Sequence, residues 1–489
     1  MSDLTARIAA LSPEKRDLLL KRLAGKSAGG QALPEMRPDP AGAGLPFPQT
    51  YVQQAYLAGR SGYFDMGACG TNFFTEFEVT GGAGPFLDRF QGALRRLIAR
   101  HDSFRTVMLP DGRQQILADP RFDLPVIDLR EAAPAEAEAR LEAERHRMKY
   151  AKAPVDRWPL FEFIACLLAD GRIRILSRIE ALILDGTSNS IWLKELFRLL
   201  EEPEADLAPY TCSFRDYVLA LEAVRETDLY ARSQRYWLER VKRLPPAPEF
   251  PLVQPPSPLV ESRPVGRAAI LLDPAAFGAF KARAARAALT PSAVVLAALA
   301  EVIAAWAASP RFTISLVASY RLPFHPEVQQ MVGNFNSITL LGVDATGGSF
   351  TDRARRLQTQ LSTDLEHMYF PGFEALQAWN RLQGAGARAA SPVLANSLIE
   401  YSHSVYEARQ LDRDGAATPD GSIAVVDAAF TVPQITFEPI FGVEPDGSLS
   451  AWWVSLDAIF PPGLFDAMFA AYQNLLRRLA TEDAAWAEM

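Results

Sequence analysis

Two carboxylates and a hydroxyl group lie within the segment IEALILDGTS, and this is the part of the chain best equipped for chemistry. Glu180 ends an alternating apolar and polar run that predicts a strand. Asp185 stands just before a predicted helix that Thr187 or Ser188 would cap, so the two acids bracket a short strand-to-helix loop. Such loops often carry function, and paired carboxylates can move protons. We therefore take Glu180, Asp185 and Ser188 as candidate catalytic residues.

Other familiar chemistries lack their starting residues. The sequence has no G-x-S-x-G, no G-x-G-x-x-G after a strand and no H-E-x-x-H. The fragment Gly25-Lys26-Ser27 imitates the end of a phosphate loop, but Leu20 occupies the place of its first glycine. The five histidines show no metal-ligand spacing, and the three cysteines (Cys69, Cys166 and Cys212) form no C-x-x-C pair. We expect no metal site and no disulfide framework.

Composition bounds the class of protein. The 489 residues are 49% hydrophobic and 22% charged, which is typical of a soluble protein with a large core. A net charge of −8 disfavours nucleic acid as a partner. The most apolar stretch, residues 293–308, is interrupted by Glu301 and is preceded by Thr290 and Pro291, so it predicts a capped core helix and no membrane span. With no targeting segment visible and free cysteines, a cytoplasmic location is expected.

The order of elements predicts an α/β protein with two similar halves. Residues 1–25 predict a docking or spacer helix, and the Gly- and Pro-rich residues 26–45 a flexible linker. A hairpin around Asp170-Gly171 and another around residues 445–447 are each followed by an amphipathic helix. This repeated order suggests a duplicated fold, divided into lobes at residues 46–205 and 206–489.

Several further segments follow one another in a characteristic order. They include PFPQTYVQQAYLAGR from Pro46, IARHDSFRTVMLPDGRQQIL from Ile98, RWPLFEF, SFRDYVLALEAVRE, YWLERVKRLPPAPEFPL, LTPSAVVLAALAEVIAAW and MVGNFNSITLLGVD. Together they resemble the heterocyclization branch of the nonribosomal peptide synthetase condensation domains. The resemblance implies two chloramphenicol acetyltransferase-like lobes that form a V-shaped pseudodimer. It also implies a site at the bottom of the cleft between them.

The resemblance gives roles to the first segment. Heterocyclization domains carry D-x-x-x-x-D-x-x-S where ordinary condensation domains have two histidines and an aspartate. Here the pattern reads Glu180, Asp185 and Ser188, with no histidine pair. In the family the second aspartate of this pattern, here Asp185, pairs with an arginine, which the resemblance places at Arg321. Two roles are therefore open for Asp185, a structural one and a catalytic one. Glu180 is a proton carrier if its surroundings are apolar and a strut if it meets an arginine.

The positions that this family uses for cyclization depart from its pattern. A segment like SQTPQ is here FTVPQ, so Val432 replaces a threonine between Thr431 and Gln434, and Val454 replaces an aspartate after Trp453. A one-residue slip would not place Thr431 there, since it would point to the opposite face of a strand. The other altered or retained positions of the expected substrate pocket are Asn334, Asn336, Ala395, Asn396 and Ser397.

These departures favour an acyltransferase that joins a carrier-bound acyl donor to a carrier-bound amine and has lost cyclodehydration. The resemblance implies phosphopantetheine arms delivered by donor and acceptor carrier proteins, neighbouring synthetase domains and no bound cofactor. It also implies a role in making a siderophore or another peptide natural product. Two alternatives remain: a non-catalytic module that holds carriers or neighbouring domains, and an acyltransferase that uses a free amine or alcohol.

Overall fold

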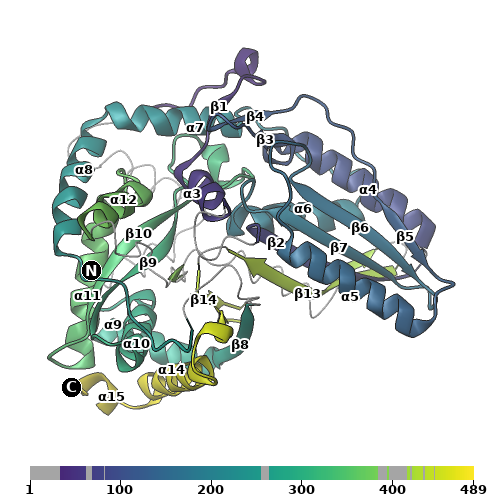
Figure 1. Cartoon of the computed structure of the whole chain (residues 1–489). Helices are drawn as coiled ribbons and strands as arrows, with labels where there is room; N and C mark the ends of the chain where they lie inside the picture. The colour runs from purple at the N-terminus through teal and green to yellow at the C-terminus, as the bar shows by residue number, and fades with distance from the viewer. Residues whose placement is uncertain are drawn as a thin grey trace.

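The protein folds into two α/β lobes that meet along a central seam, with helix α3 (Tyr51–Gly59) between them (Figure 1). The computed structural model describes residues 33–61, 69–81, 83–254, 264–383, 394–395, 416–418, 421–432, 435–444 and 446–488. The expected spacer helix at residues 1–25 and residues 26–32 of the expected linker lie outside these residues, whereas residues 33–45 of that linker are described. Among the described helices, no single one is long and apolar enough to cross a membrane.

The N-terminal lobe is built on one mixed sheet with the strand order β12-β13-β2-β7-β6-β5. Its strands are β2 (Asn72–Gly81), β5 (Val126–Leu129), β6 (Phe161–Leu168), β7 (Ile173–Glu180), β12 (Ala416–Thr418) and β13 (Gly421–Thr431). Helices α4 (Ala83–Arg100) and α6 (Gly186–Glu201) share an apolar core with one face, and α5 (Pro134–Tyr150) lies on the other. A small sheet of β1 (Phe47–Pro48), β4 (Arg113–Ile116) and β3 (Thr106–Met108) lies nearby.

Two strands of this sheet come from the far end of the sequence. Strand β13 pairs antiparallel with β2 from Gly421 opposite Gly81 to Thr431 opposite Asn72. The division into residues 46–205 and 206–489 is therefore crossed by a segment that returns to complete the first lobe. An alternating pattern predicts that a segment forms a strand but not which strands pair with it. The sequence therefore did not indicate that β13 returns to the first lobe.

The C-terminal lobe contains two three-stranded sheets, β14-β15-β8 and β10-β9-β11. Their strands are β8 (Val265–Leu272), β9 (Arg311–Ser319), β10 (Asn336–Asp344), β11 (Leu394–Ala395), β14 (Phe437–Val443) and β15 (Leu449–Ser455). The helices of this half are α7 (Phe214–Ala223), α8 (Asp228–Arg240), α9 (Pro274–Arg286), α10 (Pro291–Trp306), α11 (Phe350–Glu366), α12 (Gly372–Gln383), α14 (Leu464–Thr481) and α15 (Ala484–Ala487). Helix α10 is capped by Thr290 and buried along nearly its whole length, which confirms the predicted core helix.

Both predicted hairpins are present. Strands β6 and β7 pair antiparallel on either side of the Asp170-Gly171 turn, where Gly171 has a φ of 83°. Strands β14 and β15 pair in the same way around Gly447, which has a φ of 89°. Helices α6 and α14 follow them, and their predicted apolar faces pack into the two lobe cores. The two-lobed α/β fold expected from the sequence is confirmed.

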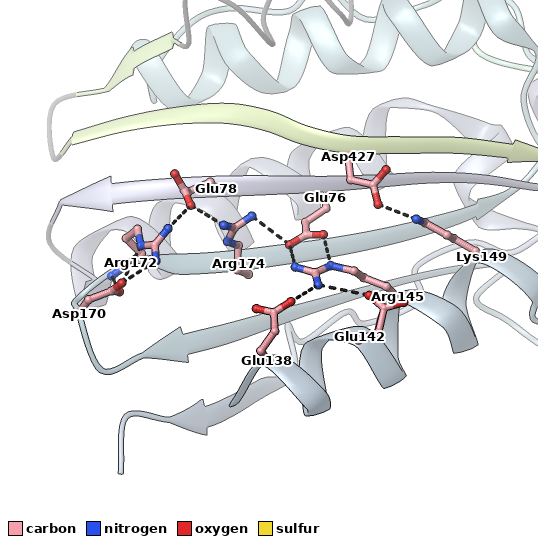
Figure 2. A network of polar contacts seen from close by, with 10 residues as sticks. All are labelled: Glu76, Glu78, Glu138, Glu142, Arg145, Lys149, Asp170, Arg172, Arg174 and Asp427. Atoms are coloured by element: carbon pink, nitrogen blue, oxygen red, sulfur yellow. Dashed lines mark hydrogen bonds and ion pairs between the residues drawn. The ribbon is translucent and has the colours of Figure 1, made fainter. Parts of the chain in front are cut away.

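The α5 side of the N-terminal sheet carries a ladder of charges (Figure 2). Glu76 on β2 is fully buried and receives Arg145 of α5 at 2.6 Å and Arg174 of β7 at 3.2 Å. Glu138 reaches the same Arg145 at 2.6 Å from a side chain that is 66% exposed. Because each buried charge has a partner of opposite sign, this face can lie under a helix without a continuous apolar layer.

Candidate functional site

Asp185 ties the two lobes together at the start of α6. It is 2% exposed and is itself the N-cap of that helix, accepting a hydrogen bond from the Ser188 amide at 2.7 Å. We had expected Thr187 or Ser188 in that place. The cap lies two residues before Thr187 and three before Ser188, because the Asp185 backbone is extended and its short carboxylate reaches the N3 amide.

The C-terminal lobe supplies the remaining partners of Asp185. Arg321 donates to its carboxylate at 3.1 Å, and the Phe335 amide donates to the other oxygen at 3.1 Å. Arg321 also contacts the Ser188 hydroxyl at 2.8 Å, and that hydroxyl donates to the Gly333 carbonyl at 2.7 Å. The structure thus brings together Asp185, Ser188 and Arg321, and the hydrogen bonds of Ser188 join it to Asp185, Arg321 and Gly333.

Glu180 lies in a second buried cluster at the end of β7. Its carboxylate is fully buried and meets Arg60, which follows α3, at 3.1 Å and Arg178 at 3.2 Å. Burial raises the pKa of Glu180, and the two guanidinium groups oppose that shift. The sequence analysis left two roles open for Glu180, a proton carrier in apolar surroundings or a strut beside an arginine. The contacts with Arg60 and Arg178 satisfy the condition for the strut.

Thr431 belongs to this same cluster. Residue 431 ends β13 opposite Asn72, which in turn lies opposite Glu180 across β2 and β7. The buried Thr431 hydroxyl accepts from the Asn72 amide at 3.3 Å and lies 3.2 Å from the Gly70 carbonyl. The hydroxyl is therefore committed to the backbone of the N-terminal lobe. Val432, the next residue, is half-buried and lies beyond the end of the strand.

Val454 faces a side chain that the sequence analysis did not single out. Strand β15 places Val454 directly opposite Glu438 of β14. Phe437 and Trp453, the preceding residue on each strand, point into the helix-covered core of the lobe. Since successive side chains of a strand point to opposite faces, Glu438 and Val454 share the other face of this sheet.

That other face of β14 is directed toward α3 and the seam between the lobes. The hydroxyl of Tyr56 on α3 interacts electrostatically with both Glu438 and Asp185, and it hydrogen-bonds with the Asn336 side chain. Burial and these two carboxylates raise the pKa of Tyr56 above its ordinary value. A cavity of about 20 Å³ lies beside Asn336, bordered by Tyr51, Tyr217 and Tyr320, and has room for about one water molecule.

Glu438 itself is an unusual carboxyl. It is 5% exposed, and no cation of the described chain is paired with it. Burial alone raises its pKa to about 8. The sequence carried one signal for it, an acid in the otherwise apolar run ITFEPIF, but periodicity could not say what that face of the strand meets. Of the other expected pocket positions, Asn396, Ser397 and Gln434 lie outside the described residues.

One group of side chains could supply metal-ligand atoms, although no metal-like spacing was visible in the sequence. Cys212, His325 and Glu327 bring such atoms within 4.8 Å of one another. The Glu327 carboxylate, however, accepts the amides of Thr211 at 3.0 Å and Cys212 at 3.1 Å, and His325 accepts the amide of Glu327 at 3.3 Å. These hydrogen bonds account for the cluster as a link between two loops.

The chain matches known proteins over almost its whole length. The family model for the condensation domain matches residues 74–416. Pyochelin synthetase PchF of Pseudomonas aeruginosa is 31% identical over 99% of this chain, and phenyloxazoline synthase MbtB of Mycobacterium tuberculosis is 32% identical over 94%. The chain spans only 26% of the first of these relatives and 32% of the second.

Solved structures agree with this match. The cyclization-docking bidomain of the nonribosomal peptide synthetase EpoB from Sorangium cellulosum is 33% identical, with a TM-score of 0.83 over 100% of this chain and 94% of that one. The synthetase FmoA3 is 28% identical, with a TM-score of 0.77 over 94% of this chain and 45% of that one. The chain therefore belongs to the condensation domain family of nonribosomal peptide synthetases, in its heterocyclization branch.

Proposed function

We propose that this domain joins a carrier-bound acyl donor to the amine of a carrier-bound amino acid and releases the open amide without forming a ring. The observation that carries the proposal is the pair of valines, Val432 and Val454, at the two positions where the sequence led us to expect a threonine and an aspartate. A valine side chain neither donates nor accepts a proton.

The two reactions of heterocyclization place different demands on a site. Amide formation starts from an activated thioester and an α-amine whose pKa is about 7.7–8.0, so part of the amine is already neutral near pH 7. Positioning the two reactants can contribute about 7–11 kcal/mol toward the barrier. Ring closure followed by loss of water requires protons to move onto and off a tetrahedral carbon. Loss of both side chains therefore weakens the second reaction more than the first.

The intact Asp185 joint supports an active domain. Asp185, Ser188 and Arg321 connect α6 to the loop that precedes β10, and removing one member of such a buried pair costs about 3–5 kcal/mol. In this proposal they act as positioning residues that hold the two lobes in register, and Glu180 acts as a strut of the N-terminal lobe. The phosphopantetheine arms of two carriers would bring the substrates to the seam.

Intact-mass analysis of the acceptor carrier tests this proposal. The carrier is loaded with Cys, Ser or Thr and mixed with the domain and a panel of acyl-loaded donor carriers. We expect a gain equal to the whole acyl group. A gain smaller by one water would contradict the loss of cyclization, and no transfer from any donor would favour the non-catalytic module or, if soluble amines react, the free-acceptor enzyme.

The matched control is a double variant, Val432→Thr with Val454→Asp, which returns the two proton-handling groups. We expect part of its product to be lighter by one water when the acceptor carries Cys, Ser or Thr. An acceptor loaded with Ala has no side-chain nucleophile, so its product should keep the full mass with either protein. A water loss with Ala would indicate a different elimination and not ring formation.

A further inference from the structure

We propose that Glu438 is the proton-transfer residue of this site, and that it takes the place left without a carboxyl by Val454. This inference rests on the proposed function, because it assigns the group that accepts the proton of the attacking amine. The strand register carries it first: Glu438 and Val454 lie directly opposite each other on β14 and β15. Directly opposed residues have Cβ atoms about 4.5–5.5 Å apart, so the Glu438 carboxyl lies near the space that a carboxyl at position 454 would serve, while Val432 still leaves ring closure without its hydroxyl.

The direction of the side chain supports this assignment. Phe437 and Trp453 occupy the core side of the sheet, which leaves Glu438 on the side toward the seam between the lobes. The hydroxyl of Tyr56 on α3 interacts electrostatically with Glu438 and Asp185, and it hydrogen-bonds with the Asn336 side chain. The Tyr56 hydroxyl therefore lies within electrostatic range of both the Glu438 carboxyl and the Asp185 joint.

The surroundings of Glu438 suit proton transfer better than those of the other buried acids near the seam. Asp185 is held by Arg321, and Glu180 by Arg60 and Arg178. Among the described residues, Tyr56 is the titratable group that interacts electrostatically with Glu438, the cross-strand neighbour Val454 is neutral, and no cation is paired with the Glu438 carboxyl. Its raised pKa, about 8, lies close to that of an α-amine, which favours transfer in both directions.

In amide formation, Glu438 alone takes up a proton from the amine and returns it to the leaving sulfur. The amine nitrogen forms a bond to the thioester carbonyl carbon, and one N–H proton passes to the Glu438 carboxylate. The C–S bond then breaks, and the sulfur of the donor arm leaves with the proton that Glu438 returns. The products are the amide on the acceptor carrier and the free thiol of the donor carrier, and the carboxylate is regenerated.

The test compares single-turnover condensation rates of the intact domain and of its Glu438→Gln variant, with both carriers loaded and an Ala acceptor. We expect a loss of about 100-fold, at the low end of the range for general acid–base catalysis, and a flatter pH profile between pH 6 and about 9. The double variant Glu438→Gln with Val454→Asp returns a carboxyl across the strand and should recover at least about 10-fold of the loss. Glu444→Gln, on the same hairpin, is the matched control and should keep the rate.

The outcomes separate this inference from the proposed function. Product mass with a Cys, Ser or Thr acceptor reports whether a ring forms, whereas the Ala rates report the role of Glu438. An unchanged rate and pH profile in a folded Glu438→Gln protein would overturn the inference and leave the proposed function standing. A slowed variant with no recovery in the double variant and an unchanged pH profile would assign Glu438 a structural role instead. A domain that transfers nothing from any donor contradicts both.

Discussion

Two buried glutamates, Glu180 at the end of β7 and Glu438 at the start of β14, differ in their surroundings more than in their burial. Glu180 is fully buried and lies against two guanidinium groups, and its cluster extends to Asn72 and Thr431. Glu438 is 5% exposed, with a valine opposite and a tyrosine hydroxyl nearby. The cations beside Glu180 oppose the rise in pKa that burial causes, whereas no cation of the described residues is paired with Glu438, whose pKa burial raises to about 8.

The largest effect should come from breaking the Glu180 cluster. Replacing Arg60 by Leu leaves the buried carboxylate with Arg178 alone and removes the Arg60 contact to the Ala153 carbonyl. We expect the free energy of unfolding to fall by about 3–5 kcal/mol, measured by urea denaturation at pH 7. A loss under about 1 kcal/mol would mean that Glu180 does not depend on its cation, and the contrast with Glu438 would fail.

The free energy of unfolding should depend on pH through Glu438, the glutamate of this comparison that has no cation partner among the described residues. The pKa of Glu438 is raised from an ordinary 4.5 to about 8, so between these values the folded protein binds more protons at this site than the unfolded chain. Its contribution is therefore most favourable below about pH 4.5 and is lost as the pH rises through about 8, by an amount on the order of 5 kcal/mol.

The Glu438→Gln variant isolates that contribution, because glutamine has the same shape and does not titrate in this range. Relative to the intact protein, we expect the variant to gain stability steadily from pH 5 to about 8. Urea denaturation at a series of pH values gives the difference curve. A constant difference between the two proteins would show that Glu438 is ionised to the same extent in the folded and unfolded states.

A smaller effect is expected from Thr431→Val. This change keeps the shape but removes the hydroxyl that accepts from the Asn72 amide, and it leaves that buried donor without this partner. We expect a loss of about 1–3 kcal/mol in the free energy of unfolding, with no change in product mass. A variant of full stability that yields a different product would instead place Thr431 in the chemistry, against its assignment to the Glu180 cluster.

The smallest effect should come from the charged ladder of the N-terminal lobe, where exposure varies within one network (Figure 2). Glu138 contacts Arg145 from a side chain that is 66% exposed, whereas Glu76 contacts it from full burial. We expect Glu138→Ala to change the free energy of unfolding by less than about 0.5 kcal/mol. A melting temperature that falls as far as in Arg60→Leu would show that exposure does not set the strength of these ion pairs.

Local patterns determined much of this protein. Alternation and turn residues gave both hairpins, and the cap at Thr290 with its proline gave α10, because these features depend on neighbours in the sequence. The ordered motifs gave the family and its two lobes. They also drew attention to Asp185 and Arg321, which the structure places in contact.

Only the tertiary structure decided which face each strand presents and what lies across from it. The sequence could name the valine at position 454 but not Glu438 opposite it, since strand register joins residues that are distant in the chain. It could not place β13 beside β2, nor bring Arg60 and Arg178 against Glu180. A residue type fixes whether a side chain can carry a proton, and the charges and solvent that surround it in the fold fix whether it does so near neutral pH.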